Sequence, residues 1–443
     1  MRHSLKSKSA VVRKRDMSRL ATLARRMVGL RWWLVVFIFI AGVLLRLPML
    51  GDQHREGDEV IYMSLVGQLE SGHGYTLQNS PIVERGIVDR YQYDRPLFFH
   101  PPGGIALFWL SYRLFGESGF SLVQVGCFAL FFWSMLFLGH GLKITKTDTG
   151  LFLVALLSSF NPLMAHVTTK FWLDGPLLAF ATFGAALFLH SFVKRNVATA
   201  VAAGIIVGYA SLIKLTAFLV MPGLLIVCVA AIRPPKWKMF VTYTLCFVIP
   251  AVIVQAPWEL WQWMVVGSPF PQWAGKPSET LIRSNAYVHF LTVVRSPWIY
   301  LTTTPMVLTT IVPSIALLIL SYARGNEDRK LKPDELPTSH IRATATACLL
   351  WMMIVVAFNM ALGFAGYSIL LRYLILLTPA SIFLPSLLVP HTMEQRSRKG
   401  TFTSRLELPL LICCAVGILA EVATGINAAL HVQRALIIPF TGL

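Results

Sequence analysis

Residues 32–62 read WWLVVFIFIAGVLLRLPMLGDQHREGDEVIY, and two features of this stretch decide the fold and the site. The first is the apolar run from Trp32 to Leu50, which as a helix is long enough to cross the roughly 30 Å hydrocarbon core of a membrane. The second is the acid pair Asp58-Glu59, which follows after a short polar stretch. Ionised carboxylates are costly close to a bilayer and are usually kept there for chemistry or transport. The acid pair is therefore the first candidate for a functional site.

Composition extends the membrane interpretation to the whole chain. Of the 443 residues, 55% are hydrophobic and only 14% are charged, and the mean hydropathy is +0.63. A soluble domain of this length would carry about 25% charged residues. We therefore expect an all-α polytopic membrane protein with about 11 transmembrane helices. The predicted spans lie at about residues 32–50, 119–141, 150–169, 174–193, 197–213, 215–232, 239–257, 301–322, 344–363, 368–390 and 406–426.

The net charge of +18 is distributed as a signal of membrane orientation rather than as a nucleic-acid-binding surface. Residues 1–31 contain ten Lys or Arg and one acid, and further basic clusters fall at the predicted turns near residues 143, 194, 236, 330 and 399. The positive-inside rule then makes all these turns cytoplasmic. We expect a basic cytoplasmic N-terminus (1–31) and a single transmembrane domain (32–443), with contacts to membrane lipids and no nucleic-acid partner. A bacterial inner membrane is favoured, and the endoplasmic reticulum is the alternative.

Two long segments, 51–118 and 258–300, are left on the outer, extracytoplasmic face. The first holds nine acids and five Arg, the opposite balance from the cytoplasmic turns. Within it we predict two short amphipathic helices, at about 59–71 and 102–115. The second follows His100-Pro101-Pro102, because proline is accepted in the first turn of a helix. We expect this helix to lie on the membrane surface, with a short span as the alternative.

Asp58 and Glu59 have the chemistry of a general base and its support. Adjacent residues cannot point the same way on a helix or strand, so one carboxylate can face a reacting group while the other holds the backbone, binds a cation or contacts an Arg. An acceptor hydroxyl or amine must lose a proton as it attacks a sugar carbon, and a carboxylate can receive that proton. The alternative is a solvated acid that caps a helix N-terminus.

Several charged residues are predicted at the same outer depth. Asp174 stands at the head of a span, so its ionisation needs a partner or water. Lys214 lies at an outer junction between spans, and Arg372 and Arg46 lie near the outer ends of theirs. Three cations at one depth would form a site for a phosphate or diphosphate. The alternative for each is a snorkelling side chain or a structural ion pair.

His100 and the aromatic segment 257–273 are weaker candidates. With His73, His54 and the neighbouring acids, His100 has the residue types that hold a divalent metal, but the spacing matches no metal signature. We assign no metal ligands, and a divalent metal is an unsupported alternative. Trp258 belongs to the aromatic segment, which is typical of an interfacial belt. The functional alternative for that segment is a lid that stacks on a sugar or covers an acyl chain.

These residues, in this order, resemble the GT-C fold glycosyltransferases of the protein O-mannosyltransferase superfamily, which includes the bacterial aminoarabinose-to-lipid-A transferases. The resemblance covers about residues 40–380. The points of contact are Arg46, Asp58-Glu59 with Tyr62, His100-Pro101-Pro102 with Leu114-Phe115-Gly116, Asp174, Lys214, Pro257-Trp258 with Gly267-Ser268-Pro269, and Arg372-Tyr373 with Pro379.

The resemblance implies a membrane hexosyl- or pentosyltransferase that moves a sugar, with inversion, from a polyprenyl-phosphate donor to an envelope acceptor (lipid, glycan or protein) on the extracytoplasmic face. It implies no required cofactor and no nucleotide-sugar site, and no glycine-rich phosphate loop occurs in the sequence. It assigns catalysis to Asp58, supported by Glu59. The expected substrate-binding residues are Arg46, Tyr62, His100, Asp174, Lys214, Trp258, Arg372 and Tyr373.

A transporter or flippase of lipid-linked sugars is the main alternative, and a non-catalytic envelope scaffold is a third. Transporters usually show related halves and helices interrupted near the midplane of the membrane. Here the ionisable residues gather at one predicted face and no repeated halves are evident. The sequence therefore favours the enzyme.

Overall fold

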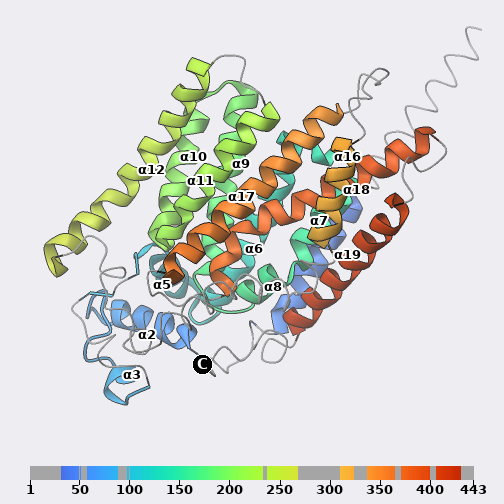
Figure 1. Cartoon of the computed structure of the whole chain (residues 1–443). Coiled ribbons are helices and arrows are strands. Elements are labelled where there is room, and N and C mark those ends of the chain that lie inside the picture. The colour runs from blue at the N-terminus through green and yellow to red at the C-terminus, as the bar shows by residue number, and fades with distance from the viewer. Residues whose placement is uncertain are drawn as a thin grey trace, which may run out of the picture.

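The regular structure is helical throughout the residues that the computed structural model describes, which are 31–48, 50, 57–87, 97–98, 100–232, 237–267, 310–323, 337–364, 371–399 and 406–430. The elements are the helix Arg31–Pro48, α2 (Asp58–Glu70), α3 (Pro81–Glu84), α5 (Gly103–Phe115), α6 (Ser118–Gly141), η1 (Ile144–Lys146), α7 (Asp148–Phe160), α8 (Pro162–Thr168), α9 (Asp174–Lys194), α10 (Val197–Ile213), η2 (Leu215–Leu219), α11 (Val220–Val227), η3 (Cys228–Ile232), α12 (Trp237–Val266), α16 (Val312–Ala323), α17 (Thr338–Phe364), η6 (Leu371–Leu377), α18 (Thr378–Lys399) and α19 (Glu407–Leu430) (Figure 1).

Each of the eleven predicted spans coincides, over its described residues, with one helix or with consecutive helices, while residues 301–309 and 368–370 of two spans lie outside the described ranges. The number of membrane crossings is not confirmed. Within the described ranges, seven helices are long and apolar enough to cross a membrane, or eight if the bent pair α7 and α8 counts as one crossing. The apolar helices Val197–Ile213, Leu215–Ala230 and Val312–Ala323 are shorter. The prediction counted every apolar run as a membrane span. In the structure, these three runs form helices that are shorter than the others.

The bend between α7 and α8 has a local cause. The two helices meet at an angle of 44° at Asn161, which is followed by Pro162. Proline has no backbone N–H to continue the hydrogen bonds of α7, and it suits the first turn of a new helix. The Asn161 side chain caps that helix by accepting a hydrogen bond from the Met164 N–H at 3.1 Å. Helix α8 is followed by the loop 169–173, which leads into α9.

Helices α6, α9, α10 and α12 pack in sequence as neighbours across one part of the bundle (Figure 1). Small residues allow the close approach of α10 to its neighbours: Gly184 of α9 lies against Val207, and Gly204 of α10 lies against the Phe247 carbonyl group of α12. Such small-residue contacts are typical of helix pairs in membranes.

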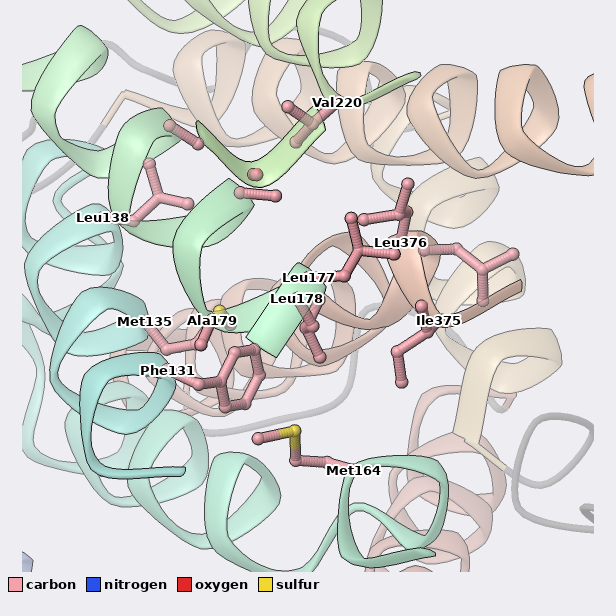
Figure 2. Packing of buried hydrophobic residues seen from close by; sticks show 14 of the residues in the cluster. Phe131, Met135, Leu138, Met164, Leu177, Leu178, Ala179, Val220, Ile375 and Leu376 are labelled. Atoms are coloured by element: carbon pink, nitrogen blue, oxygen red, sulfur yellow. The ribbon is translucent and has the colours of Figure 1, made fainter. Parts of the chain in front are cut away.

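The remaining long helices pack on the other side of α6 and α9. Helix α17 contacts α11 and α18, and α19 runs along α7 and α8. The short helix η6 packs against α8 and α9, so that Ile375 and Leu376 meet Leu177, Leu178 and Met164 in the core (Figure 2). This contact brings η6 to the first turns of α9.

The two predicted helices of the first outer segment are present as α2 and α5, each within one residue of the expected start. Their position relative to the membrane surface stays a prediction. Glu70 at the end of α2 joins them, because its carboxylate accepts a hydrogen bond from Trp109 at 2.9 Å and lies 3.5 Å from Arg113. Of the six cysteines, four are buried in the core, Cys246 is half-buried and Cys413 is exposed.

Candidate active site

Helix α2 presents the acid pair on its first turn. It begins after Gly57, whose φ of 55° lies in the left-handed region that favours glycine. Asp58 and Glu59 therefore stand at the positive end of the helix dipole, where carboxylates are stabilised. Gly57 itself is the N-cap and no side chain caps the helix, so the alternative in which an acid of this pair serves as the N-cap is wrong.

Glu59 forms a hydrogen bond to a loop that is distant in the sequence. Its side chain is buried, and Oε1 accepts a hydrogen bond from the backbone N–H of Phe171 at 2.9 Å. Phe171 lies in the loop between α8 and α9 and stacks on Phe120 of α6, with ring centroids 5.2 Å apart. Of the roles expected for the second carboxylate, holding the backbone is therefore the one that the contacts support.

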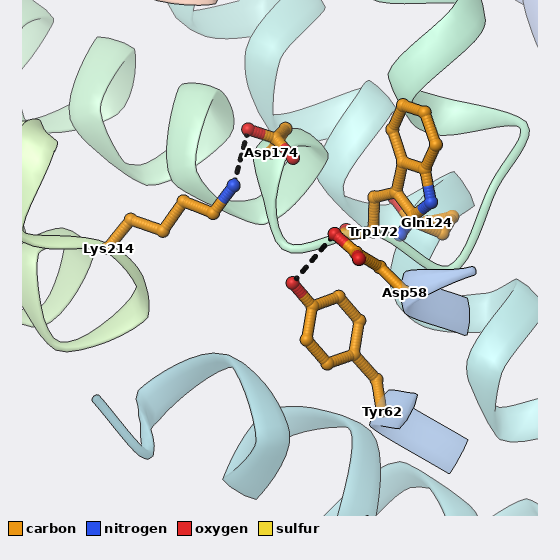
Figure 3. Close-up of polar contacts among 6 residues, drawn as sticks. All are labelled: Asp58, Tyr62, Gln124, Trp172, Asp174 and Lys214. Carbon is orange, nitrogen blue, oxygen red and sulfur yellow. Dashed lines mark hydrogen bonds and ion pairs between the residues drawn. The ribbon is translucent and has the colours of Figure 1, made fainter. Parts of the chain in front are cut away.

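Asp58 is half-buried, in contrast to its neighbour. The buried Tyr62, one turn along α2, donates a hydrogen bond from its hydroxyl to Asp58 Oδ2 over 3.4 Å. This contact orients the carboxylate. Figure 3 shows the Asp58 and Lys214 side chains pointing toward the same space between α2 and the start of α9.

Lys214 and Asp174 form a buried ion pair next to that space. Lys214 follows the last residue of α10 in extended backbone, and its Nζ lies 2.8 Å from Oδ1 of Asp174, the first residue of α9. The side chains are 8% and 1% exposed. Asp174 thus has the partner that its apolar surroundings require.

The other oxygen of the Asp174 carboxylate is unused. Asp174 Oδ2 is buried and has no hydrogen-bond partner among the described residues. The same holds for Oε1 of Gln124, whose Nε2 donates to the Trp172 carbonyl oxygen at 2.9 Å. A buried acceptor without a donor is rare in proteins and marks a place where a ligand or water supplies one.

Gln124 was not anticipated from the sequence. It is the only amide side chain in the apolar run of α6, which is the signal that identifies it in hindsight.

Residues around His100 form a wall beside the end of α10 that leads to Lys214, where Gly103 lies against Leu212 and Gly104 lies against Ile213. Tyr75 donates from its hydroxyl to the His100 carbonyl at 3.0 Å, and its ring meets the edge of Trp258 at 5.8 Å. Burial raises the pKa of Tyr75 well above its ordinary value, so the hydroxyl stays a donor. The buried Trp258 is part of the wall, whereas Trp261 and Trp263 on α12 are exposed, as expected for an interfacial belt.

Arg46 does not join this group, which corrects the expectation that it binds the donor phosphate. Its guanidinium is buried over the Phe128 ring and donates to Gly42, Ser159 and Thr168 oxygens at 2.6, 2.9 and 2.8 Å. These bonds tie the first helix to α7 and α8. Arg46 is therefore a structural residue, the alternative that the sequence left open.

Arg372 and Tyr373 lie in η6, and their side chains are outside the described residues. His54 is also outside them. In the described part of the chain, no group of three or more His, Cys, Asp or Glu could hold a metal ion. His73 is exposed and contacts Ser71 through Nδ1 at 3.0 Å.

Comparison with known proteins supports the resemblance seen in the sequence. Residues 99–261 match the family model described as dolichyl-phosphate-mannose-protein mannosyltransferase. The matched range contains His100, Asp174, Lys214 and Trp258. The predicted resemblance to the protein O-mannosyltransferase superfamily is therefore confirmed over this part of the chain. No curated protein matches the chain.

Solved structures confirm the GT-C fold. The archaeal oligosaccharyltransferase AglB from Archaeoglobus fulgidus, in complex with an inhibitory peptide and a dolichol-phosphate, is similar with a TM-score of 0.51 and 12% identity. The apo form of the oligosaccharyltransferase from the same organism has a TM-score of 0.52, also at 12% identity. Each match covers 89% of this chain and 56% of the other chain, so this chain spans little more than half the length of those enzymes. At such low identity the likeness concerns the fold.

Proposed function

We propose that this protein is an inverting glycosyltransferase that moves a sugar from a polyprenyl-phosphate donor to an envelope acceptor on the extracytoplasmic face of a bacterial inner membrane. The observation that carries the proposal is the convergence of a half-buried carboxylate, Asp58, and a buried cation, Lys214, on one space at one end of the bundle (Figure 3). Transfer of a sugar from a phosphate requires both groups, on opposite sides of the anomeric carbon. The carboxylate faces the attacking acceptor, and the cation faces the leaving phosphate.

Asp58 acts as the general base. As the acceptor oxygen or nitrogen forms its bond to the anomeric carbon, its proton passes to the Asp58 carboxylate, and the bond from that carbon to the phosphate oxygen breaks. Attack from the face opposite the leaving phosphate inverts the configuration. The Tyr62 hydroxyl orients Asp58 through the contact at 3.4 Å. Glu59 acts indirectly, because it holds the Phe171 backbone and so sets the distance between α2 and α9.

Lys214 binds the donor phosphate, which is also the leaving group. A fixed cation stabilises the negative charge that develops on the departing phosphate. In its pair with Asp174 the Lys214 charge is already balanced, so a second cation is needed, and we assign that role to Arg372. The packing of η6 against the first turns of α9 supports this assignment, because η6 contains Arg372 (Figure 2).

The remaining groups position the sugar. Asp174 Oδ2 and Gln124 Oε1, the two buried acceptors without a donor in the described residues, accept hydrogen bonds from sugar hydroxyls. The wall formed by His100 and Trp258 closes the site on the side of α5 and α12. The family match over residues 99–261 supports sugar transfer over the alternative, a flippase of lipid-linked sugars.

The test is the substitution Asp58→Asn, which keeps the size of the side chain and removes the base. We expect sugar transfer from a polyprenyl-phosphate sugar, measured in membranes that contain the full chain, to fall by about 10²- to 10⁴-fold. Donor binding and membrane insertion should be unchanged, because Asp58 does not contact the phosphate in this proposal.

Glu84→Gln is the matched control, since Glu84 is an exposed acid at the end of α3 in the same outer segment. It should transfer sugar at the normal rate. Undiminished transfer by the Asp58→Asn protein would remove Asp58 from its role. Transport of the lipid-linked sugar without any transfer product would favour the flippase.

A further inference from the structure

A separate cavity lies at the opposite end of the bundle from Asp58. Its volume is about 560 Å³, and it is enclosed by the start of the first helix, the end of α6, η1 and the start of α7. Helix α6 extends from the candidate active site to the cavity. Gln124 lies beside the candidate active site, and His140 lines the cavity. The two residues are about 24 Å apart along the axis of α6, at 1.5 Å per residue. The polar and aromatic residues that line it are Arg31, Trp32, Trp133, Phe137, His140, Thr145 and Lys146.

The turn that forms the floor of this cavity is well fixed. Ile144 and Thr145 of η1 are buried. The Thr147 side chain caps α7 by accepting a hydrogen bond from the Gly150 N–H at 3.0 Å. Thr145 and Lys146 therefore project from a turn that is packed on one side and capped on the other.

The cavity has a net positive charge. Arg31 Nε lies 2.5 Å from Asp148 Oδ1, which balances one charge but leaves the two terminal amino groups of the guanidinium as donors. Asp148 does not line the cavity. Lys146 is exposed and forms no ion pair with another described residue. The Arg31 guanidinium and the Lys146 ammonium group, which line the same cavity, can together bind a phosphate group.

The cavity opens beside a surface suited to acyl chains. Trp133 is held by Phe39 and Phe132, with ring centroids at 5.7 and 5.3 Å, and it is still 40% exposed. Trp32 is 49% exposed, and Phe37, which follows it on the first helix, is 68% exposed. Tryptophan with neighbouring exposed apolar residues is typical of the membrane interface.

We propose that this cavity binds the headgroup of an anionic phospholipid, with the phosphate on Arg31 and Lys146 and the acyl chains along Trp133 and the first helix. The exposed apolar surface favours a lipid over a soluble anion, and basic cavities between transmembrane helices are known sites for acidic headgroups. The proposal is independent of the reaction at Asp58. It gives the protein a structural lipid at the membrane face away from the candidate active site.

The test is lipid binding to the purified full chain in detergent, measured by native mass spectrometry. Phosphatidylglycerol and phosphatidylcholine with identical acyl chains are titrated in parallel. We expect the first phosphatidylglycerol to bind more tightly than phosphatidylcholine. Lys146→Gln should weaken the binding of phosphatidylglycerol about fivefold, equivalent to about 1 kcal/mol for one basic residue at an anionic surface.

Lys194→Gln is the control, because Lys194 is an exposed lysine at the same end of the bundle, at the end of α9, and does not line the cavity. It should bind phosphatidylglycerol like the unmodified chain. Equal binding of the two lipids, or equal loss in the two variants, would overturn the proposal. Displacement of the lipid by inorganic phosphate at the same concentration would assign the cavity to a free anion and overturn it too.

Discussion

Lys214 and Asp174 place opposite charges where almost no water reaches them. Removing two charges from water often costs as much free energy as their attraction returns, so a buried pair is weak evidence for stability. Here one carboxylate oxygen also lacks a donor in the described part of the chain. Both facts fit a pair that is kept for ligand binding rather than for folding.

Substitutions at this pair separate the two roles. Lys214→Met leaves Asp174 buried without its cation and should lower the free energy of unfolding by about 3–5 kcal/mol. The double substitution Lys214→Met with Asp174→Leu removes both charges and should recover most of that loss. Sugar transfer should stay absent in both proteins. Thermal unfolding in detergent and a transfer assay measure the two effects.

A double variant with normal transfer would exclude the pair from the active site. A double variant as unstable as the single one would contradict the electrostatic argument.

At the scale of elements, the break between α7 and α8 positions the loop that carries Phe171. Helix α19 packs against this break. Asn161 donates a hydrogen bond to Glu421 of α19 at 2.8 Å, and Gly425 of α19 lies directly against the carbonyl oxygen of Phe160. A Cβ atom at position 425 has no room unless the helices move apart. The packing of α19 against α8 therefore affects the position of the loop 169–173, which carries Phe171.

Gly425→Ala tests this connection. The added methyl group should push α19 from α7 and lower the free energy of unfolding by about 1–3 kcal/mol, as overpacking does. The matched control is Gly126→Ala in α6, where nothing lies within 4 Å of the added Cβ. It should be neutral or slightly stabilising, because alanine favours helix more than glycine does. Equal melting temperatures of the two variants would show that α19 does not brace the break.

At the scale of the molecule, the bundle has two chemically different ends. Helices α2 and α3, which carry four acids, lie with α5 at one end of the bundle (Figure 1). The basic residues of η1 and of the cavity lie toward the other end, beyond the end of α6. The positive-inside rule predicts that the basic end faces the cytoplasm.

Cysteine labelling tests this orientation. In a chain with the exposed Cys413 replaced by Ser, a membrane-impermeant maleimide should label Glu84→Cys in intact spheroplasts. Thr149→Cys, an exposed position at the start of α7, should be labelled only after lysis. The reverse pattern would invert the topology and move the candidate active site to the cytoplasm.

The helices, and the residues that have the chemistry of a candidate site, can be predicted from the sequence. Apolar runs and proline positions act locally, so α2, α5 and the long helices occur where they were predicted. The acid pair and Lys214 were found because charge is rare in such a chain, where each buried charge must have a use.

Which of these residues contact one another depends on the packing of the helices. The Glu59–Phe171 bond spans 112 positions and the Lys214–Asp174 bond spans 40. Arg46 was misassigned to the phosphate site because two of its partners, Ser159 and Thr168, lie 113 and 122 positions away. Contacts of this range depend on helix packing, which sequence periodicity does not contain. The fold therefore separates a structural arginine from a lysine of the candidate site, although the two look alike in the sequence.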